Sequence, residues 1–108
     1  MVKIIDGGVA VDDRGQLSFV NDFNFENVKR FYMVENHEKG FIRAWHGHKK
    51  EGKYVYVPSG AILIGAVDLD TEQVDRFVLS SSKPQVLYIP PGYANGFMNL
   101  QDNTKVIF

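Results

Sequence analysis

Residues 41–50 read FIRAWHGHKK, and this stretch decides the fold. An apolar-rich run over Phe41–His48 follows the turn signal Glu38–Gly40, and together they predict a short β-strand. His46 and His48 are separated by one residue, so their imidazoles lie on the same face of that strand. Because imidazole exchanges a proton near neutral pH, such a pair can bind a metal or act as a general base.

Short runs of the same kind recur along the chain between turn signals, and no longer window carries an apolar stripe at helical spacing. We therefore expect an all-β domain whose strands form a sandwich or a barrel, since these arrangements bury one face of every strand. The predicted strands are Gln16–Val20, Lys29–Val34, Phe41–His48, Lys53–Val57, Ala61–Asp68, Gln73–Leu79, Val86–Ile89, Gly96–Leu100 and Thr104–Phe108.

The length of 108 residues is that of one domain, spanning residues 1–108. The chain stops inside the apolar run Thr104–Phe108, and we expect the natural protein to continue beyond it.

Composition excludes several classes of function. The chain has 12 basic and 13 acidic residues and a formal net charge of −1, which gives no overall attraction to nucleic acid or to anionic membranes. No apolar run approaches the roughly 20 residues of a membrane-spanning helix, and the apolar start of the chain is too short for a signal peptide. Cysteine is absent, so disulfides and thiolate chemistry are excluded. We expect a cytoplasmic protein without nucleic-acid or membrane partners.

Two spaced sets of residues resemble the two motifs of the cupin family. The first set is Gly40, His46, His48, Lys53 and Gly60, and the second is Pro90, Gly92, Asn95 and Asn99. The resemblance implies a cupin fold, a double-stranded β-helix or jelly-roll barrel, with a site inside the mouth of the barrel.

The residues that depart from the cupin motifs argue against a metal. Metal-binding cupins use two His, a Glu and a later His, but Lys53 stands at the Glu position and Asn95 at the later His position. An ammonium repels a divalent cation, and an amide is a poor ligand for a transition metal. Glu51, two residues away, is the alternative ligand. We expect chemistry without a metal or other cofactor, in which His takes a proton from carbon beside a carbonyl and a cation stabilises the enolate.

Nearly the whole chain resembles a narrower group, the dTDP-4-dehydrorhamnose 3,5-epimerases. The segments that carry this resemblance include Asp12–Gly15, Arg43–His46, Lys53–Val55, Val67–Leu69 and Pro90–Phe97. A second group, the TDP-sugar 3,4-ketoisomerases, is similar at residues 29–32 and 43–50. Both groups are metal-free cupins that act on nucleotide-linked 4-keto sugars.

The resemblance implies a role for each matching residue. His46 matches the epimerase general base, and His48 matches the second ketoisomerase histidine. Lys53 matches the cation that steadies the enolate oxygen at C4. Arg14 and Arg43 match positions that contact the diphosphate or the sugar, where a guanidinium fork suits phosphate oxygens.

The proton-donating acid is less clearly placed. The catalytic Tyr of the epimerases aligns with Phe108, which cannot transfer a proton. Tyr32 is the favoured replacement because the ketoisomerases have a Tyr there, and Tyr88 and Tyr93 remain alternatives. We also expect Tyr93 and Asn95, from the second motif, to bind the substrate.

Three functions follow from these residues. The favoured one is a metal-independent isomerase, an epimerase of the 3- or 3,5-type that abstracts a proton beside the C4 ketone of a nucleotide-linked 4-keto-6-deoxy hexose. The alternatives are a 3,4-ketoisomerase and a non-catalytic cupin that binds a sugar nucleotide. We expect the protein to be a homodimer.

Overall fold

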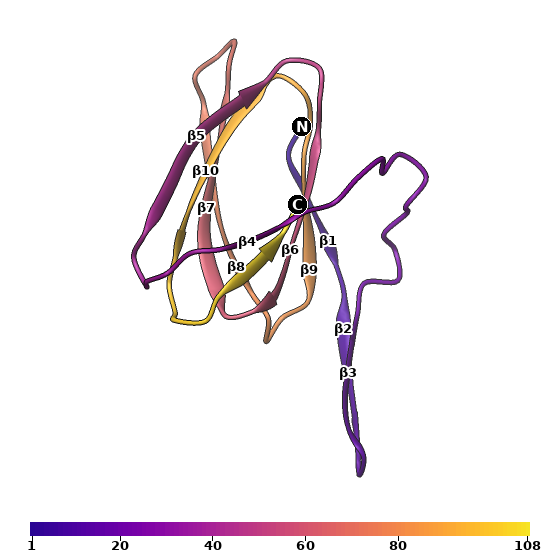
Figure 1. Cartoon of the computed structure of the whole chain (residues 1–108). Helices are drawn as coiled ribbons and strands as arrows, with labels where there is room; N and C mark the ends of the chain where they lie inside the picture. The colour runs from indigo at the N-terminus through magenta and orange to yellow at the C-terminus, as the bar shows by residue number, and fades with distance from the viewer.

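Every regular element of the described chain is a β-strand (Figure 1). The computed structural model describes the backbone of residues 1–108 and all side chains except that of His48. Within these residues no helix is long and apolar enough to cross a membrane. The strands are β1 (Lys3–Asp6), β2 (Gly8–Asp12), β3 (Gly15–Phe19), β4 (Met33–Glu35), β5 (Ile42–His48), β6 (Lys53–Ser59), β7 (Ala61–Asp68), β8 (Val74–Ser80), β9 (Gln85–Ile89), β10 (Tyr93–Asn99) and β11 (Lys105–Ile107).

Two antiparallel sheets face each other across the core. The five-stranded sheet has the order β1-β9-β6-β11-β4, and the four-stranded sheet has the order β5-β10-β7-β8. Fully buried residues such as Val55 and Leu87 on the first sheet belong to the same apolar cluster as Ile62 and Ile64 on the second. The prediction of an all-β cupin-type jelly roll is confirmed.

Alternation along β6 decides which side chains enter the barrel. Val55 and Val57 are 0% and 2% exposed, so residues of the same parity, including Lys53 at the start of the strand, lie on the inner face. Tyr54 and Tyr56 therefore lie on the outer face. The connection Lys49–Gly52 is short, so β5 ends at the same end of the barrel at which β6 begins with Lys53.

A register shift between β5 and β10 sets the inner face of β5. His46 pairs with Asn95, and Arg43 pairs with Phe97. His46 and Arg43 are three positions apart on β5, whereas their partners are only two positions apart on β10. Asn95 and Phe97 are buried, so their partners His46 and Arg43 both face inward. Residues three positions apart on a regular strand point to opposite faces. A bulge with one extra residue in β5 allows both side chains to point inward.

Glycines on β10 and β7 leave room for the side chains at the bulge of β5. A Cβ on Gly96 would stand 2.6 Å from the Cβ of Ala44, and one on Gly65 would stand 3.1 Å from the ring of Trp45. Trp45 thus lies across Gly65 on the outer face of the four-stranded sheet, opposite His46, and it is exposed.

The hairpin of β2 and β3 extends away from the barrel (Figure 1). It pairs only with itself, and its side chains Val11 and Leu17 are 74% and 64% exposed. The turn at its tip contains Arg14 and points away from the end of the barrel at which β5 meets β6 (Figure 1).

Several strand predictions differ from the structure, and β10 begins at Tyr93, three residues before the predicted start at Gly96. β1 and β2 were not predicted, because β1 is a short edge strand beside β9 and β2 has no core to impose an apolar pattern. The predicted strand Lys29–Val34 is wrong for most of its length, since regular pairing begins only at Met33. Tyr32 still exchanges two backbone hydrogen bonds with Phe108, so the segment meets the sheet at that point.

Candidate active site

Lys53, on the inner face of the five-stranded sheet, contacts Tyr32. The Nζ of Lys53 donates a hydrogen bond to the Oη of Tyr32 over 3.1 Å. Both side chains are half-buried, so the ammonium and the phenol remain accessible to a ligand. Two residues that the sequence assigned to catalysis, 21 positions apart, are therefore brought together.

Phe108 forms the wall behind this pair. Its ring stacks on that of Tyr32 with centroids 5.4 Å apart and an interplanar angle of 19°, and the Nζ of Lys53 lies 5.1 Å from its centroid. Phe108 also contacts the buried ring of Phe97. The aromatic wall fixes the plane of the Tyr32 ring, and a cation over a ring face is attracted by its quadrupole.

Arg30 adds a second cation that the role assignments from the sequence missed. Its Cζ lies 5.0 Å from the centroid of the Tyr32 ring. The sequence could have indicated Arg30, because this residue belongs to the segment 29–32 that resembles the ketoisomerases.

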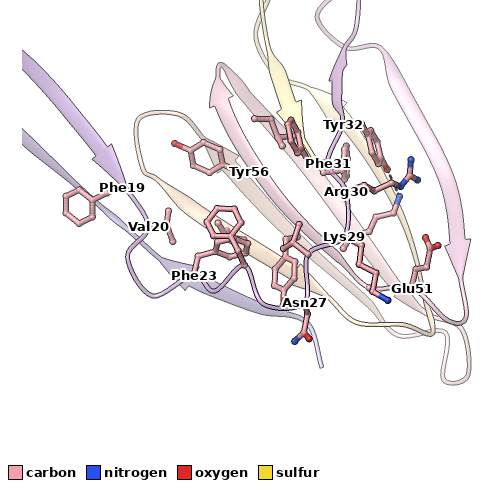
Figure 2. A pocket seen from close by; sticks show the side chains of 18 of the residues that line it. Phe19, Val20, Phe23, Asn27, Lys29, Arg30, Phe31, Tyr32, Glu51 and Tyr56 are labelled. Atoms are coloured by element: carbon pink, nitrogen blue, oxygen red, sulfur yellow. Dashed lines mark hydrogen bonds between the residues drawn. The ribbon is translucent and has the colours of Figure 1, made fainter.

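A groove of about 1030 Å³ runs between the segment before β4 and the five-stranded sheet (Figure 2). Phe23 and Tyr56 lie toward one end, and Arg30, Tyr32 and Glu51 toward the other (Figure 2). Aromatic rings of the lining contact one another, since Phe23 meets Phe25 edge-on at 4.7 Å and Tyr54 edge-on at 5.0 Å. Four cationic side chains contribute to the lining, namely Lys29, Arg30, Lys50 and Lys53.

The opposite wall of the barrel carries His46, Asn95 and Tyr93. The Nδ2 of Asn95 donates to the backbone carbonyl of His46 over 3.3 Å, and Asn95 is 3% exposed. Asn95 thus fixes the backbone that carries His46, which is itself exposed. Tyr93 has the same parity on β10 as Asn95 and packs against the core. His48 pairs with Tyr93 through the backbone, and its side chain lies outside the described residues.

Arg43 is held by the buried amide of Asn36, which is in turn bonded to the buried amide of Asn99. Its Nε donates to the Oδ1 of Asn36 over 2.6 Å, and the Nδ2 of Asn36 donates to the Oδ1 of Asn99 over 3.2 Å. Asn36 and Asn99 are 9% and 2% exposed. This chain joins the segment after β4 to β5 and β10. Neither Asn36 nor the network was foreseen, because nothing local in the sequence links positions so far apart.

Arg14 lies apart from all of these residues. Its side chain, 87% exposed at the hairpin tip, pairs with Asp12 over 2.6 Å. The side-chain hydrogen bond from Arg14, helped by its backbone amide, lowers the pKa of the Asp12 carboxyl. Within one copy of the chain the hairpin therefore carries Arg14 away from the barrel. Among the side chains that the structure describes, no three His, Asp or Glu gather into a metal-binding group.

One family of known proteins matches the whole of this jelly roll. The family model for dTDP-4-dehydrorhamnose 3,5-epimerase matches residues 2–108. The chain belongs to this family. A curated family member, the dTDP-4-dehydrorhamnose 3,5-epimerase of Escherichia coli K12, is 32% identical over 118 aligned positions, which cover 94% of this chain and 63% of the relative. The chain thus spans less than two-thirds of that epimerase.

Solved structures of the epimerase family share the fold. The Bacillus anthracis dTDP-4-dehydrorhamnose 3,5-epimerase, solved with TDP and pyrophosphate, superposes with a TM-score of 0.83 at 26% identity, covering 98% of this chain and 69% of the other. A TDP-quinovose 3,4-ketoisomerase from Campylobacter jejuni has a TM-score of 0.77 at 23% identity, covering 98% and 81%. At that identity the second likeness shows the common fold alone.

Proposed function

We propose that the protein is an isomerase that epimerises a nucleotide-linked 4-keto-6-deoxy hexose at C3, or at C3 and C5. The observation that carries this proposal is the hydrogen bond between Lys53 and Tyr32, beside a groove lined by aromatic rings and cations. Membership of the 3,5-epimerase family supports it.

The reaction needs a base, a stabiliser for an enolate and an acid. His46 removes the proton from the carbon next to the C4 ketone, and the electrons of the broken C–H bond move onto the C4 oxygen. The ammonium of Lys53 hydrogen-bonds this enolate oxygen. The hydroxyl of Tyr32 then gives its proton to the carbon from the opposite face, which inverts the centre. His46 ends protonated and Tyr32 ends as a phenolate beside Lys53, and exchange with water restores both.

Substrate binding is divided between aromatic rings and cations. We assign the nucleotide to the aromatic groove, since a base stacks on rings such as Tyr54, and the diphosphate to Arg43, whose guanidinium fork suits phosphate oxygens. The TDP and pyrophosphate in the B. anthracis relative support this class of ligand. Tyr93 and Asn95 contact the sugar, and His48 takes the role implied by its match to the second ketoisomerase histidine. The reaction requires no metal or other cofactor, because Lys53 supplies the positive charge.

The protein acts as a homodimer in the cytoplasm, with neither nucleic acid nor membrane as a partner. Two exposed surfaces support dimer formation, the hairpin side chains Val11 and Leu17 and the outer-face residue Trp45. Because Arg14 stands at the tip of the extended hairpin, it serves the active site of the second copy.

Deuterium incorporation tests the function and separates the candidates. The protein is incubated with TDP-4-keto-6-deoxyglucose in deuterated water, and the sugar is followed by NMR. An epimerase gives inverted product with deuterium at C3, or at C3 and C5. A 3-keto product would instead establish the ketoisomerase, which the similarity of residues 29–32 favours as the second candidate. Binding without either product would leave a sugar-nucleotide-binding cupin.

A further inference from the structure

We propose that Asn36 is a positioning residue that orients the guanidinium of Arg43 toward the diphosphate of the substrate. This role rests on the proposed sugar-nucleotide function. The bond from the Nε of Arg43 to the Oδ1 of Asn36 measures 2.6 Å, at the short end for a charge-assisted hydrogen bond. It occupies the Nε and leaves the two terminal nitrogens of the exposed Arg43 fork without a partner among the described residues.

The amide of Asn36 can face Arg43 in one way only. The Nε of arginine is a donor, so the amide must present its oxygen to Arg43 and its nitrogen elsewhere. That nitrogen donates to the Oδ1 of Asn99, which is 2% exposed. The buried Asn99 therefore locks the orientation that Arg43 requires.

The network is arranged at a cost to Asn99. Its own Nδ2 is buried and has no hydrogen-bond partner among the described atoms, which is unfavourable for folding. A carboxylate at position 36 would also accept from the Nε of Arg43. The same carboxylate would cancel the charge of Arg43. An amide orients the guanidinium and leaves its full charge for an anion.

A double-mutant cycle measures whether Asn36 acts through Arg43. TDP is titrated calorimetrically into the unmodified chain, Asn36→Ala, Arg43→Ala and the double variant. We expect Asn36→Ala to weaken TDP binding about five- to twenty-fold in the unmodified background and less than about two-fold in the Arg43→Ala background. Asn21→Ala, at an exposed position outside the groove, is the matched control and should bind TDP normally.

A second variant keeps the proposal testable if Asn36→Ala does not fold. Asn36→Asp should still fold, because the carboxylate has the shape of the amide and accepts from the Nε of Arg43. It should nevertheless bind TDP at least about ten-fold more weakly and with a shallower salt dependence, since one cation is neutralised. In the epimerisation assay the Asp variant should raise KM while kcat stays within about two-fold.

The outcomes separate this assignment from the proposed function. Failure of the unmodified chain to bind TDP would overturn both. If TDP binds but Asn36→Ala weakens it equally with and without Arg43, or if Asn36→Asp binds it normally, the positioning role is wrong while the sugar-nucleotide function stands.

Discussion

Tyr32 and Phe108 lie side by side, with rings stacked at 5.4 Å and both backbone hydrogen bonds exchanged between them. Phe108 occupies the position at which the resemblance to the epimerases places a catalytic Tyr. A phenol is therefore present beside that position, supplied by the neighbouring segment.

Exchanging the two side chains should test this replacement. Tyr32→Phe should slow epimerisation about 10²–10⁴-fold, because the proton donor is lost. Adding Phe108→Tyr in the same chain should recover at least about ten-fold of that loss, since the new hydroxyl lies on the adjacent stacked ring. Rates are measured by NMR of the sugar. An unchanged rate for Tyr32→Phe would remove Tyr32 from the mechanism and direct attention to Tyr88 and Tyr93.

His46→Asn should abolish deuterium incorporation, with a loss of about 10²–10⁴-fold, because an amide cannot take the proton. TDP binding should persist, since the nucleotide is bound elsewhere. His37→Asn is the control, because His37 is exposed in the connection between β4 and β5. Full exchange in His46→Asn would show that another group is the base.

Activity should survive chelation. Lys53 supplies the positive charge that a metal would otherwise provide, so prolonged treatment with EDTA should leave the rate unchanged. Elemental analysis of the purified protein is the companion measurement. Stoichiometric iron, zinc or nickel, together with activity lost on chelation and restored by the metal, would refute the prediction.

The glycines beneath the β5 bulge should be intolerant of a methyl group. Gly96→Ala should destabilise the fold by about 1–3 kcal/mol, because the new Cβ would stand 2.6 Å from that of Ala44. Gly47→Ala on β5 is the matched control. Its Cβ would stand 3.7 Å from that of Ala94, an ordinary contact, so the change should stay within about 0.5 kcal/mol. Urea unfolding measures both, and equal effects would contradict the tight packing at Gly96.

Mixing two inactive variants should restore activity if Arg14 serves the second copy. In a mixed dimer of His46→Asn and Arg14→Ala chains, one site has an intact His46 and receives an intact Arg14 from its partner. Each variant alone should be strongly impaired. After mild unfolding and refolding together, about a quarter of all sites should regain activity, because half the dimers are mixed and each has one intact site. No recovery would place Arg14 in the site of its own chain or outside any site.

The sequence predicted the strands of the barrel better than the hairpin of β2 and β3 and the segment before β4. The run Ala61–Asp68 is patterned by the core, so its strand was recognised with correct bounds. Val9 and Val11 of the hairpin are exposed. Because no core selects apolar residues at alternate positions there, β2 was missed. Lys29–Val34 has strand-like composition, but its first residues run over the groove instead of pairing in a sheet.

Within the proposed site, motif spacing indicated candidate residues but not the side chains that they contact. His46 and Lys53 were proposed from motif distances, and Tyr32 from a local resemblance. The link from Arg43 through Asn36 to Asn99 joins positions 63 residues apart and exists only because the two sheets meet there. A bulge, which shifts parity by one residue, likewise leaves no clear mark in the sequence, so the inward direction of Arg43 required the register of β5 against β10.

The hairpin of β2 and β3 has a consequence for how the protein behaves in dilute solution. Its tip lies outside the barrel of its own chain (Figure 1), so if Arg14 serves the second copy, as we propose, the complete active site exists only while two copies are associated. Specific activity should then fall as the protein is diluted below the dissociation constant of the dimer, and it should recover on concentration. The catalytic rate would thereby depend on the abundance of the protein itself as well as on that of its substrate.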